Sequence, residues 1–142
     1  AIIPTIITQI ASGSKVINLG DLTPTRDFSF VIDTCNGFKL LGESSNVIGE
    51  TINIGSNTEI SIDELLNKIK YLMRSDVEIK SDNERIRPKN SEVFRLVCDN
   101  QKIIKLVSYK PLTDIDSGLR KTIDWVLEPD HLKRYKTEIF NV

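Results

Sequence analysis

The stretch that decides the fold runs from Ser61 to Met73 and reads SIDELLNKIKYLM. Its first four residues form a capping box, in which the Ser61 hydroxyl and the Glu64 carboxylate satisfy free amide groups at the start of a helix. Apolar side chains then recur at helical spacing and form one stripe, made of Ile62, Leu65, Leu66, Ile69, Leu72 and Met73. The pattern predicts an amphipathic helix.

Short apolar strands alternate with helices on both sides of this segment. The predicted strands are residues 15–19, 28–31, 50–55, 77–80 and 94–98. The other predicted helices are one that opens the chain, one over residues 32–43, one capped by Asp99 and one that starts near Asp116. In the helix over residues 32–43, Ile32, Cys35, Phe38 and Leu41 step down one face. The alternation indicates a mixed α/β chain.

Length and composition fit one domain with a core of its own. The 142 residues are 39% apolar and 27% charged, and 19 Lys and Arg stand against 20 Asp and Glu. The net charge of −1 removes the global electrostatic argument for a nucleic-acid or membrane-surface protein. No apolar run reaches the ~20 residues of a membrane span, and no basic region precedes the apolar start. Two cysteines far apart predict a reduced, cytoplasmic protein without a disulfide framework.

Metal and nucleophile chemistry lack the residues that they need. His131 is the only histidine, and the two cysteines show no C-x-x-C spacing, so a transition-metal site lacks ligands. A Ser-His-Asp or Cys-His arrangement would have to use His131, which lies in the polar tail over residues 129–142, and a solvated surface histidine is the simpler interpretation. We therefore predict no metal site.

Three polar clusters remain as candidates for binding. Arg26 lies in a loop ahead of a predicted strand, where a guanidinium can grip a phosphate with two hydrogen bonds, or can merely pair with Asp27 at the surface. Asn53 lies at the end of a predicted strand, and ligands of open α/β sheets bind outside the carboxyl ends of the strands. An ordinary strand-to-helix turn would show the same sequence pattern. Residues 80–110 hold eight basic against four acidic side chains, a local charge of +4, which can attract a diphosphate or only form a solvated face.

Several segments of the sequence, taken in their order along the chain, resemble a known family. They are residues 4–7, 19–34 and 49–56, Arg87-Pro88 followed by residues 99–103, and residues 109–111 and 118–125. Together they are similar to the extended short-chain dehydrogenases, the NAD-dependent nucleotide-sugar epimerases and dehydratases, over residues 1–128. The resemblance implies the C-terminal substrate-binding part of such an enzyme, with the last strands of a Rossmann-type sheet and small helical and strand elements.

Within that family, residues 22–27, 85–88 and 91–96 most resemble 4,6-dehydratases of nucleotide-linked N-acetylglucosamine. The implied reaction oxidises C4 with bound NAD, eliminates water across C5 and C6, and returns the hydride to C6, giving a 4-keto-6-deoxy sugar. Three alternatives stay open: a nucleotide-sugar 4-epimerase of the same family, a non-catalytic nucleotide-sugar-binding module, and a plain α/β structural domain.

The resemblance also assigns roles to individual residues. Its implied substrate-binding set is Arg26 and Arg87 on the diphosphate, Asn53 on the nucleotide, Asn90 and Ser91 near the ribose, and Arg95 on the nucleotide-facing loop. The implied partner is a nucleotide-diphosphate sugar, with neither nucleic acid nor membrane, and a homodimer formed through upstream helices stays open.

The family's catalytic and cofactor motifs are not in this sequence. Its seven glycines never form G-x-x-G-x-x-G, and Tyr71, Tyr109 and Tyr135 are followed four positions on by Ser75, Thr113 and Ile139 instead of lysine. The resemblance therefore implies that the NAD-binding Rossmann portion, with the catalytic residues, lies upstream and is absent from this chain.

Overall fold

The computed structural model describes residues 1–82 and 93–135. The chain divides into two compact units, each assembled from segments that are distant in sequence. Of the described residues, the first unit takes 1–24, 61–82 and 119–135, and the second takes 25–60 and 93–118. No described helix has the length and apolarity to cross a bilayer.

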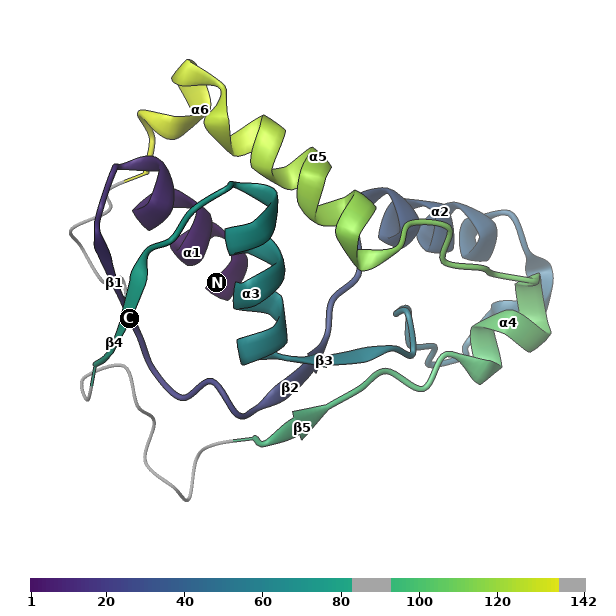
Figure 1. The fold of residues 1–142 in the computed structure, drawn as a ribbon. Coiled ribbons are helices and arrows are strands. Elements are labelled where there is room, and N and C mark those ends of the chain that lie inside the picture. Colours follow the sequence, from purple (N-terminus) through teal and green to yellow (C-terminus); the bar gives the residue numbers. More distant parts are fainter. Residues whose placement is uncertain (83–92, 136–142) are drawn as a thin grey trace. The chain divides into compact units, whose positions relative to one another are not determined.

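The first unit pairs two parallel strands with helices. Its elements are α1 (Ile2–Ala11), β1 (Val16–Leu19), α3 (Ile62–Leu72), β4 (Glu78–Ser81), α6 (Pro129–Leu132) and most of α5 (Ile115–Leu127) (Figure 1). In the parallel pair, Val16 lies opposite Glu78 and Leu19 opposite Ser81. The predictions of an opening helix, of strands near 15–19 and 77–80, and of a helix after Asp116 are confirmed.

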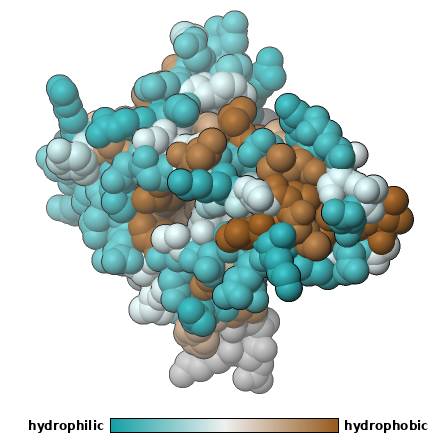
Figure 2. All heavy atoms as spheres, turned by 90° about the vertical axis from the view of Figure 1, so that its right-hand side faces the viewer, coloured by the Kyte–Doolittle hydropathy of each residue, from teal (hydrophilic) through white to brown (hydrophobic). Residues whose placement is uncertain are grey.

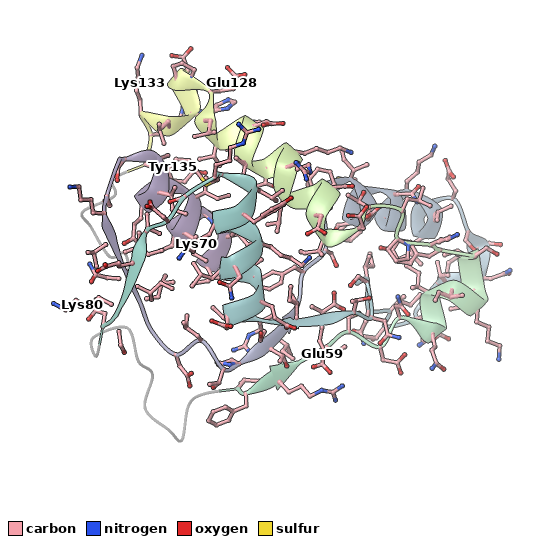
Figure 3. The ribbon with its side chains drawn as sticks, in the orientation of Figure 1. Glu59, Lys70, Lys80, Glu128, Lys133 and Tyr135 are labelled. Atoms are coloured by element: carbon pink, nitrogen blue, oxygen red, sulfur yellow. The ribbon has the colours of Figure 1, made fainter. Side chains whose placement is uncertain are left out.

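The capped helix α3 forms the centre of this unit. As predicted, the Glu64 amide donates to the Ser61 hydroxyl at 3.1 Å, and the Ser61 amide donates to the Glu64 carboxylate at 2.9 Å. The Lys70 ammonium, on the last turn of α3, donates to the Val77 carbonyl at 2.7 Å, which ties the helix to the segment leading into β4 (Figure 3). The buried apolar residues of the unit are Ile6, Ile7, Ile17, Leu19, Ile62, Leu65, Leu66, Ile69, Val77, Leu119, Ile123 and Val126.

The second unit contains three very short strands and two helices. They are β2 (Thr25–Asp27), α2 (Val31–Gly42), β3 (Glu59–Ser61), β5 (Arg95–Leu96) and α4 (Gln101–Val107), with a single 3₁₀ turn at Ser45–Val47. The strand order is β3-β2-β5, and β2 runs parallel to β5. β3 reaches one residue into the first unit, at Ser61.

Two predicted strands were wrong. In each case the position of the neighbouring strand explains the difference. The strand predicted over residues 28–31 lies instead at Thr25–Asp27, where the Thr25 amide donates to the Phe94 carbonyl at 2.8 Å, and α2 already begins at Val31. Residues 50–55, also predicted as a strand, do not form one, because no strand of the described chain pairs with them to complete a ladder. An apolar alternation sets a preference for extended backbone, but a strand needs a neighbour.

Candidate functional site

Arg26 lies at the centre of β2, and its side chain is half-buried. Its guanidinium donates to the Thr25 carbonyl at 2.8 Å, and it makes further polar contacts. Because the guanidinium is already held against the strand, it is oriented before any ligand arrives. A guanidinium held in this way loses less side-chain freedom when it binds a carboxylate or phosphate.

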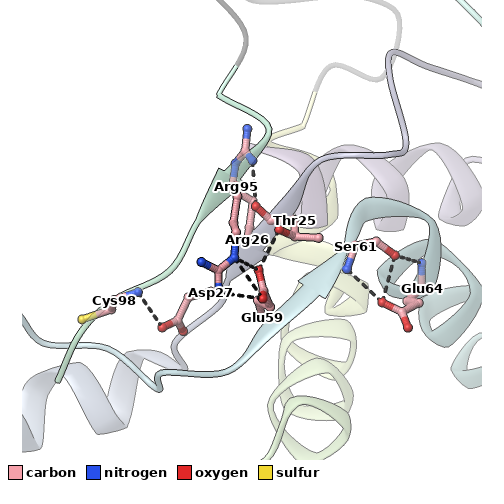
Figure 4. Close-up of polar contacts among 8 residues, drawn as sticks. All are labelled: Thr25, Arg26, Asp27, Glu59, Ser61, Glu64, Arg95 and Cys98. Carbon is pink, nitrogen blue, oxygen red and sulfur yellow. Dashed lines mark hydrogen bonds and ion pairs between the residues drawn. The ribbon is translucent and has the colours of Figure 1, made fainter. Parts of the chain in front are cut away.

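A three-residue clasp crosses the small sheet beside Arg26. The Arg95 guanidinium donates to both oxygens of Glu59, with Nε to Oε2 and Nη2 to Oε1 each at 2.9 Å (Figure 4). The Thr25 hydroxyl donates to the same carboxylate at 2.9 Å. The hydrogen bond from Arg95, followed by that from Thr25, lowers the pKa of Glu59 below its ordinary value. The clasp therefore joins β2, β3 and β5 through side chains.

Arg26 and Arg95 belong to opposite faces of the β2–β5 pair. In the register of that pair Thr25 lies opposite Arg95 and Arg26 lies opposite Leu96. Since successive side chains of a strand point to opposite faces, Thr25 and Arg95 share one face, as their common partner Glu59 requires, and Arg26 points to the other. The structure does not bring these two predicted site residues together.

Asp27 organises the loops at the end of β2. Its carboxylate accepts hydrogen bonds from the Ser56 amide at 3.2 Å and hydroxyl at 2.6 Å, from the Asn57 amide at 2.8 Å, and from the Cys98 amide at 3.2 Å. Asn57 itself has a φ of 58°, a left-handed conformation that asparagine tolerates better than most residues. One charged side chain thus fastens the loop after Asn53 and the segment after β5 to β2.

The same junction is closely packed. A Cβ atom on Gly55 would overlap the Cβ of Cys98 and lie 2.6 Å from its sulfur, so this position has room only for glycine. The buried Asn100 amide donates to the Gly55 carbonyl at 3.0 Å. Burial, followed by the carboxylates of Asp27 and Asp99, raises the pKa of the Cys98 thiol. That thiol therefore stays protonated and packs as a small apolar group.

Asn53 is exposed between two anchored ends. Gly55 is held as described, and on the other side the Lys102 ammonium donates to the Thr51 carbonyl at 2.9 Å and pairs with the Glu50 carboxylate at 2.7 Å. The hydrogen bond from Lys102, together with its charge, lowers the pKa of Glu50. The Asn53 side chain is consequently displayed by a short segment fixed on both sides.

The predicted site residues fall into three groups. Arg26 and Asn53 lie on β2 and on the segment that Asp27 helps to fasten. Arg95 is engaged with Glu59 on the other face of the sheet. Arg87, Asn90 and Ser91 lie outside the described residues, so their predicted roles stay predictions.

Sequence reasoning missed Asp27 as a structural centre, because it read that carboxylate only as a surface partner of Arg26. Its partners lie 29 to 71 residues further along the chain. The small polar run Gly55-Ser56-Asn57 was a usable signal, since such a run offers backbone amides and a hydroxyl that a carboxylate can bind.

A comparison with protein families decides the assignment. The model of the family described as GDP-mannose 4,6 dehydratase matches residues 1–122. The chain belongs to this family. Its relatives are epimerases and dehydratases of the extended short-chain dehydrogenase group. This chain corresponds to part of the C-terminal portion of these enzymes. The predicted family and fold class are confirmed.

Individual relatives show the range of activities in the family. A UDP-N-acetyl-alpha-D-glucosaminuronate decarboxylase of Bacillus cytotoxicus is 30% identical over 129 residues, 89% of this chain and 40% of the relative. The structure of an epimerase from Methanothermobacter thermautotrophicus matches with a TM-score of 0.83 and 28% identity, over 94% of this chain and 39% of that one. A dTDP-glucose 4,6-dehydratase of Bacillus anthracis, solved in complex with NAD, matches with a TM-score of 0.76 and 25% identity, over 92% of this chain and 40% of that one.

The chain spans about two fifths of the length of these relatives. The Bacillus anthracis dehydratase was solved in complex with NAD, and the glycine spacing that cradles a dinucleotide does not occur in the sequence of this chain. This chain presents the Arg26 guanidinium, which is held against its own strand, and the exposed side chain of Asn53 on a segment anchored at both ends.

Proposed function

We propose that this chain binds the nucleotide-diphosphate part of a nucleotide sugar, with Arg26 and Arg87 on the diphosphate and Asn53 on the nucleotide. The observation that carries the proposal is the junction around Asp27, which anchors the segment of Asn53 to the strand that presents Arg26. Relatives of the chain include a nucleotide-sugar decarboxylase and a nucleotide-sugar dehydratase, which supports a substrate of this class. Asn90, Ser91 and Arg95 belong to the proposal as further substrate contacts.

We propose further that the whole protein is an NAD-dependent 4,6-dehydratase that turns a nucleotide-linked N-acetylhexosamine into its 4-keto-6-deoxy derivative. The part played by this chain is to hold and orient the substrate, since a diphosphate fixed at two guanidinium groups limits where the attached sugar can lie. The proposal places the protein in the cytoplasm and leaves open whether it forms a homodimer through the upstream portion.

Binding measurements test the nucleotide-sugar proposal directly. We expect UDP-N-acetylglucosamine, titrated calorimetrically, to bind the chain, and Arg26→Ala to weaken that binding by about 2 kcal/mol, roughly 30-fold, because a charged contact is lost. Arg120→Ala is the matched control, since Arg120 is exposed on α5, and it should leave the affinity unchanged. If both variants and the unaltered chain bound UDP-N-acetylglucosamine with equal affinity, the proposal would be wrong and the chain would be a plain α/β structural domain.

A 4-epimerase is the second candidate, and the match to the Methanothermobacter epimerase at a TM-score of 0.83 favours it. The two reactions differ in their product. A dehydratase gives a 4-keto sugar that absorbs in alkali, whereas an epimerase returns a hexose inverted at C4. Incubating the longer protein with NAD and the nucleotide sugar decides between them, and a protein that binds the nucleotide sugar but changes nothing would be the non-catalytic module.

A further inference from the structure

The segment over residues 51–54 is held by a side chain instead of by a sheet. No strand of the described chain pairs with it, and among the described residues the only hydrogen bond to its backbone comes from Lys102, at 2.9 Å from the Thr51 carbonyl. Exposure alternates along the segment, so that Thr51 and Asn53 are exposed and the two isoleucines are half-buried. Asn53 therefore shares the outward side of the segment with Thr51.

Both ends of this segment are tied to the start of one helix. Ile103 is fully buried and anchors α4 in the core of the second unit. The buried Asn100, directly before α4, donates to the Gly55 carbonyl at 3.0 Å, while Lys102 on the first turn holds Thr51. Because both contacts come from the same short stretch of chain, they limit the paths that the backbone between them can take.

Lys102 is the part of this attachment that lies at the surface. Figure 2 faces the side of the molecule on which α4 lies in Figure 1, and hydrophilic residues surround a hydrophobic patch there. The Lys102 side chain is 49% exposed, and its ammonium also pairs with the Glu50 carboxylate at 2.7 Å. Just upstream, Gly49 has a φ of 80° and nothing within 4 Å of an added Cβ, so no neighbour holds this turn. Loss of Lys102 would therefore loosen the backbone before Asn53 without opening the core.

We infer that Lys102 is a positioning residue, which fixes the direction in which Asn53 is presented to the nucleotide. The inference rests on the proposed function, since it requires Asn53 to contact the nucleotide. An asparagine on a fixed backbone has little freedom left to lose on binding, whereas one on a loose segment must be ordered when the ligand arrives. Lys102 acts through the backbone, because its ammonium is engaged by the Thr51 carbonyl and by Glu50.

A double-mutant cycle tests this coupling, with UDP-N-acetylglucosamine titrated calorimetrically into the chain. We expect Lys102→Met to weaken binding by about three- to tenfold, the cost of ordering a short segment on binding. In an Asn53→Ala background the same substitution should cause no further loss, because both changes act on one contact. In an Arg26→Ala background it should cause the full loss again, since Arg26 is held by its own strand. A merely structural role of Lys102 would give equal losses in both backgrounds.

Two further variants separate the position of the backbone from the charge of the lysine. Lys102→Arg keeps a charged donor for the Thr51 carbonyl and should bind within about twofold of the unaltered chain. Lys105→Met removes the same charge from an exposed position of the same helix, and it should leave the affinity unchanged. Urea unfolding of each variant confirms that the titrated chain is folded.

The possible outcomes distinguish the inference from the proposed function. If Asn53→Ala weakens binding but Lys102→Met either has no effect or adds its full loss in that background, the inference is wrong and the proposed function stands. If Asn53→Ala binds as tightly as the unaltered chain, both the nucleotide contact and the inference are wrong. If the unaltered chain does not bind UDP-N-acetylglucosamine, the proposed function is wrong and the inference is lost with it.

Discussion

The carboxylate of Asp27 accepts two hydrogen bonds from Ser56, one from its hydroxyl at 2.6 Å and one from its amide at 3.2 Å. The same carboxylate also accepts hydrogen bonds from the backbone amides of Asn57 and Cys98. Without it, three backbone amides would lose a charged acceptor at a half-buried position. Hydrogen bonds to charged groups are stronger than neutral ones, and a donor left unpaired adds its own cost.

Asp27→Ala should therefore lower the free energy of unfolding by about 2–3 kcal/mol, measured by urea titration. Asp27→Asn keeps one acceptor oxygen and should lose less. Asp124→Ala, at an exposed position of α5, serves as the matched control and should stay within about 0.5 kcal/mol. If Asp27→Ala were as mild as the control, the junction would not depend on this carboxylate.

Gly55 should tolerate no larger side chain. Gly55→Ala places a methyl group against the Cβ and sulfur of Cys98, and such overpacking costs about 1–3 kcal/mol. Gly42 lies at the end of α2 with nothing within 4 Å of an added Cβ, so Gly42→Ala should be neutral or stabilise the protein by up to about 1 kcal/mol. Thermal or urea unfolding of both variants checks the contrast, and a neutral Gly55→Ala would contradict the close packing.

The Glu59–Arg95 clasp predicts a dependence of stability on acid. The pKa of Glu59 is lower in the folded chain than in the unfolded one, so its contribution is fully present above the unfolded pKa and is lost as the pH falls through the folded value. Glu59→Gln should remove this part of the acid-induced loss. Urea midpoints between pH 3 and pH 7 measure it, and Glu128→Gln, at an exposed residue of the other unit, is the control.

Local patterns predicted the elements whose cause is local. The capping box and apolar stripe of residues 61–73 fixed α3 almost to the residue, because every interaction that starts that helix lies within four positions. Strands were less predictable, since each depends on a neighbour far along the chain. Thr25–Asp27 forms β2 through Arg95 and Leu96, about seventy residues away, and residues 51–54 have the sequence of a strand without a partner.

The candidate site shows the same division. Arg26 and Asn53 were recognisable as polar groups at suitable positions, but the contacts that hold them were not. Glu59 pairs with Arg95 across 36 residues, and Asp27 reaches Cys98 across 71. The sequence pattern did not predict which face of α2 is buried. The spacing of its apolar residues gave no indication that Asp33 would be buried and would accept hydrogen bonds from the amides of Leu112 and Thr113.

Tyr109 carries the last prediction, because its hydroxyl is buried without a hydrogen-bond partner in the described structure. Burial, with the nearby charge of Asp33 as the next cause, raises the pKa of Tyr109, so the group remains a neutral O–H. An unpaired buried hydroxyl costs free energy, and its removal leaves little space behind.

Tyr109→Phe should accordingly leave the free energy of unfolding unchanged or raise it by up to about 1 kcal/mol. Tyr71→Phe, at a side chain that is 80% exposed, should change it by less than about 0.5 kcal/mol. Urea unfolding of the two variants beside the unaltered chain makes the comparison. A clear loss of stability in Tyr109→Phe alone would show that the hydroxyl has a partner in solution, and would require the packing between α2 and Tyr109 to differ from the arrangement described above.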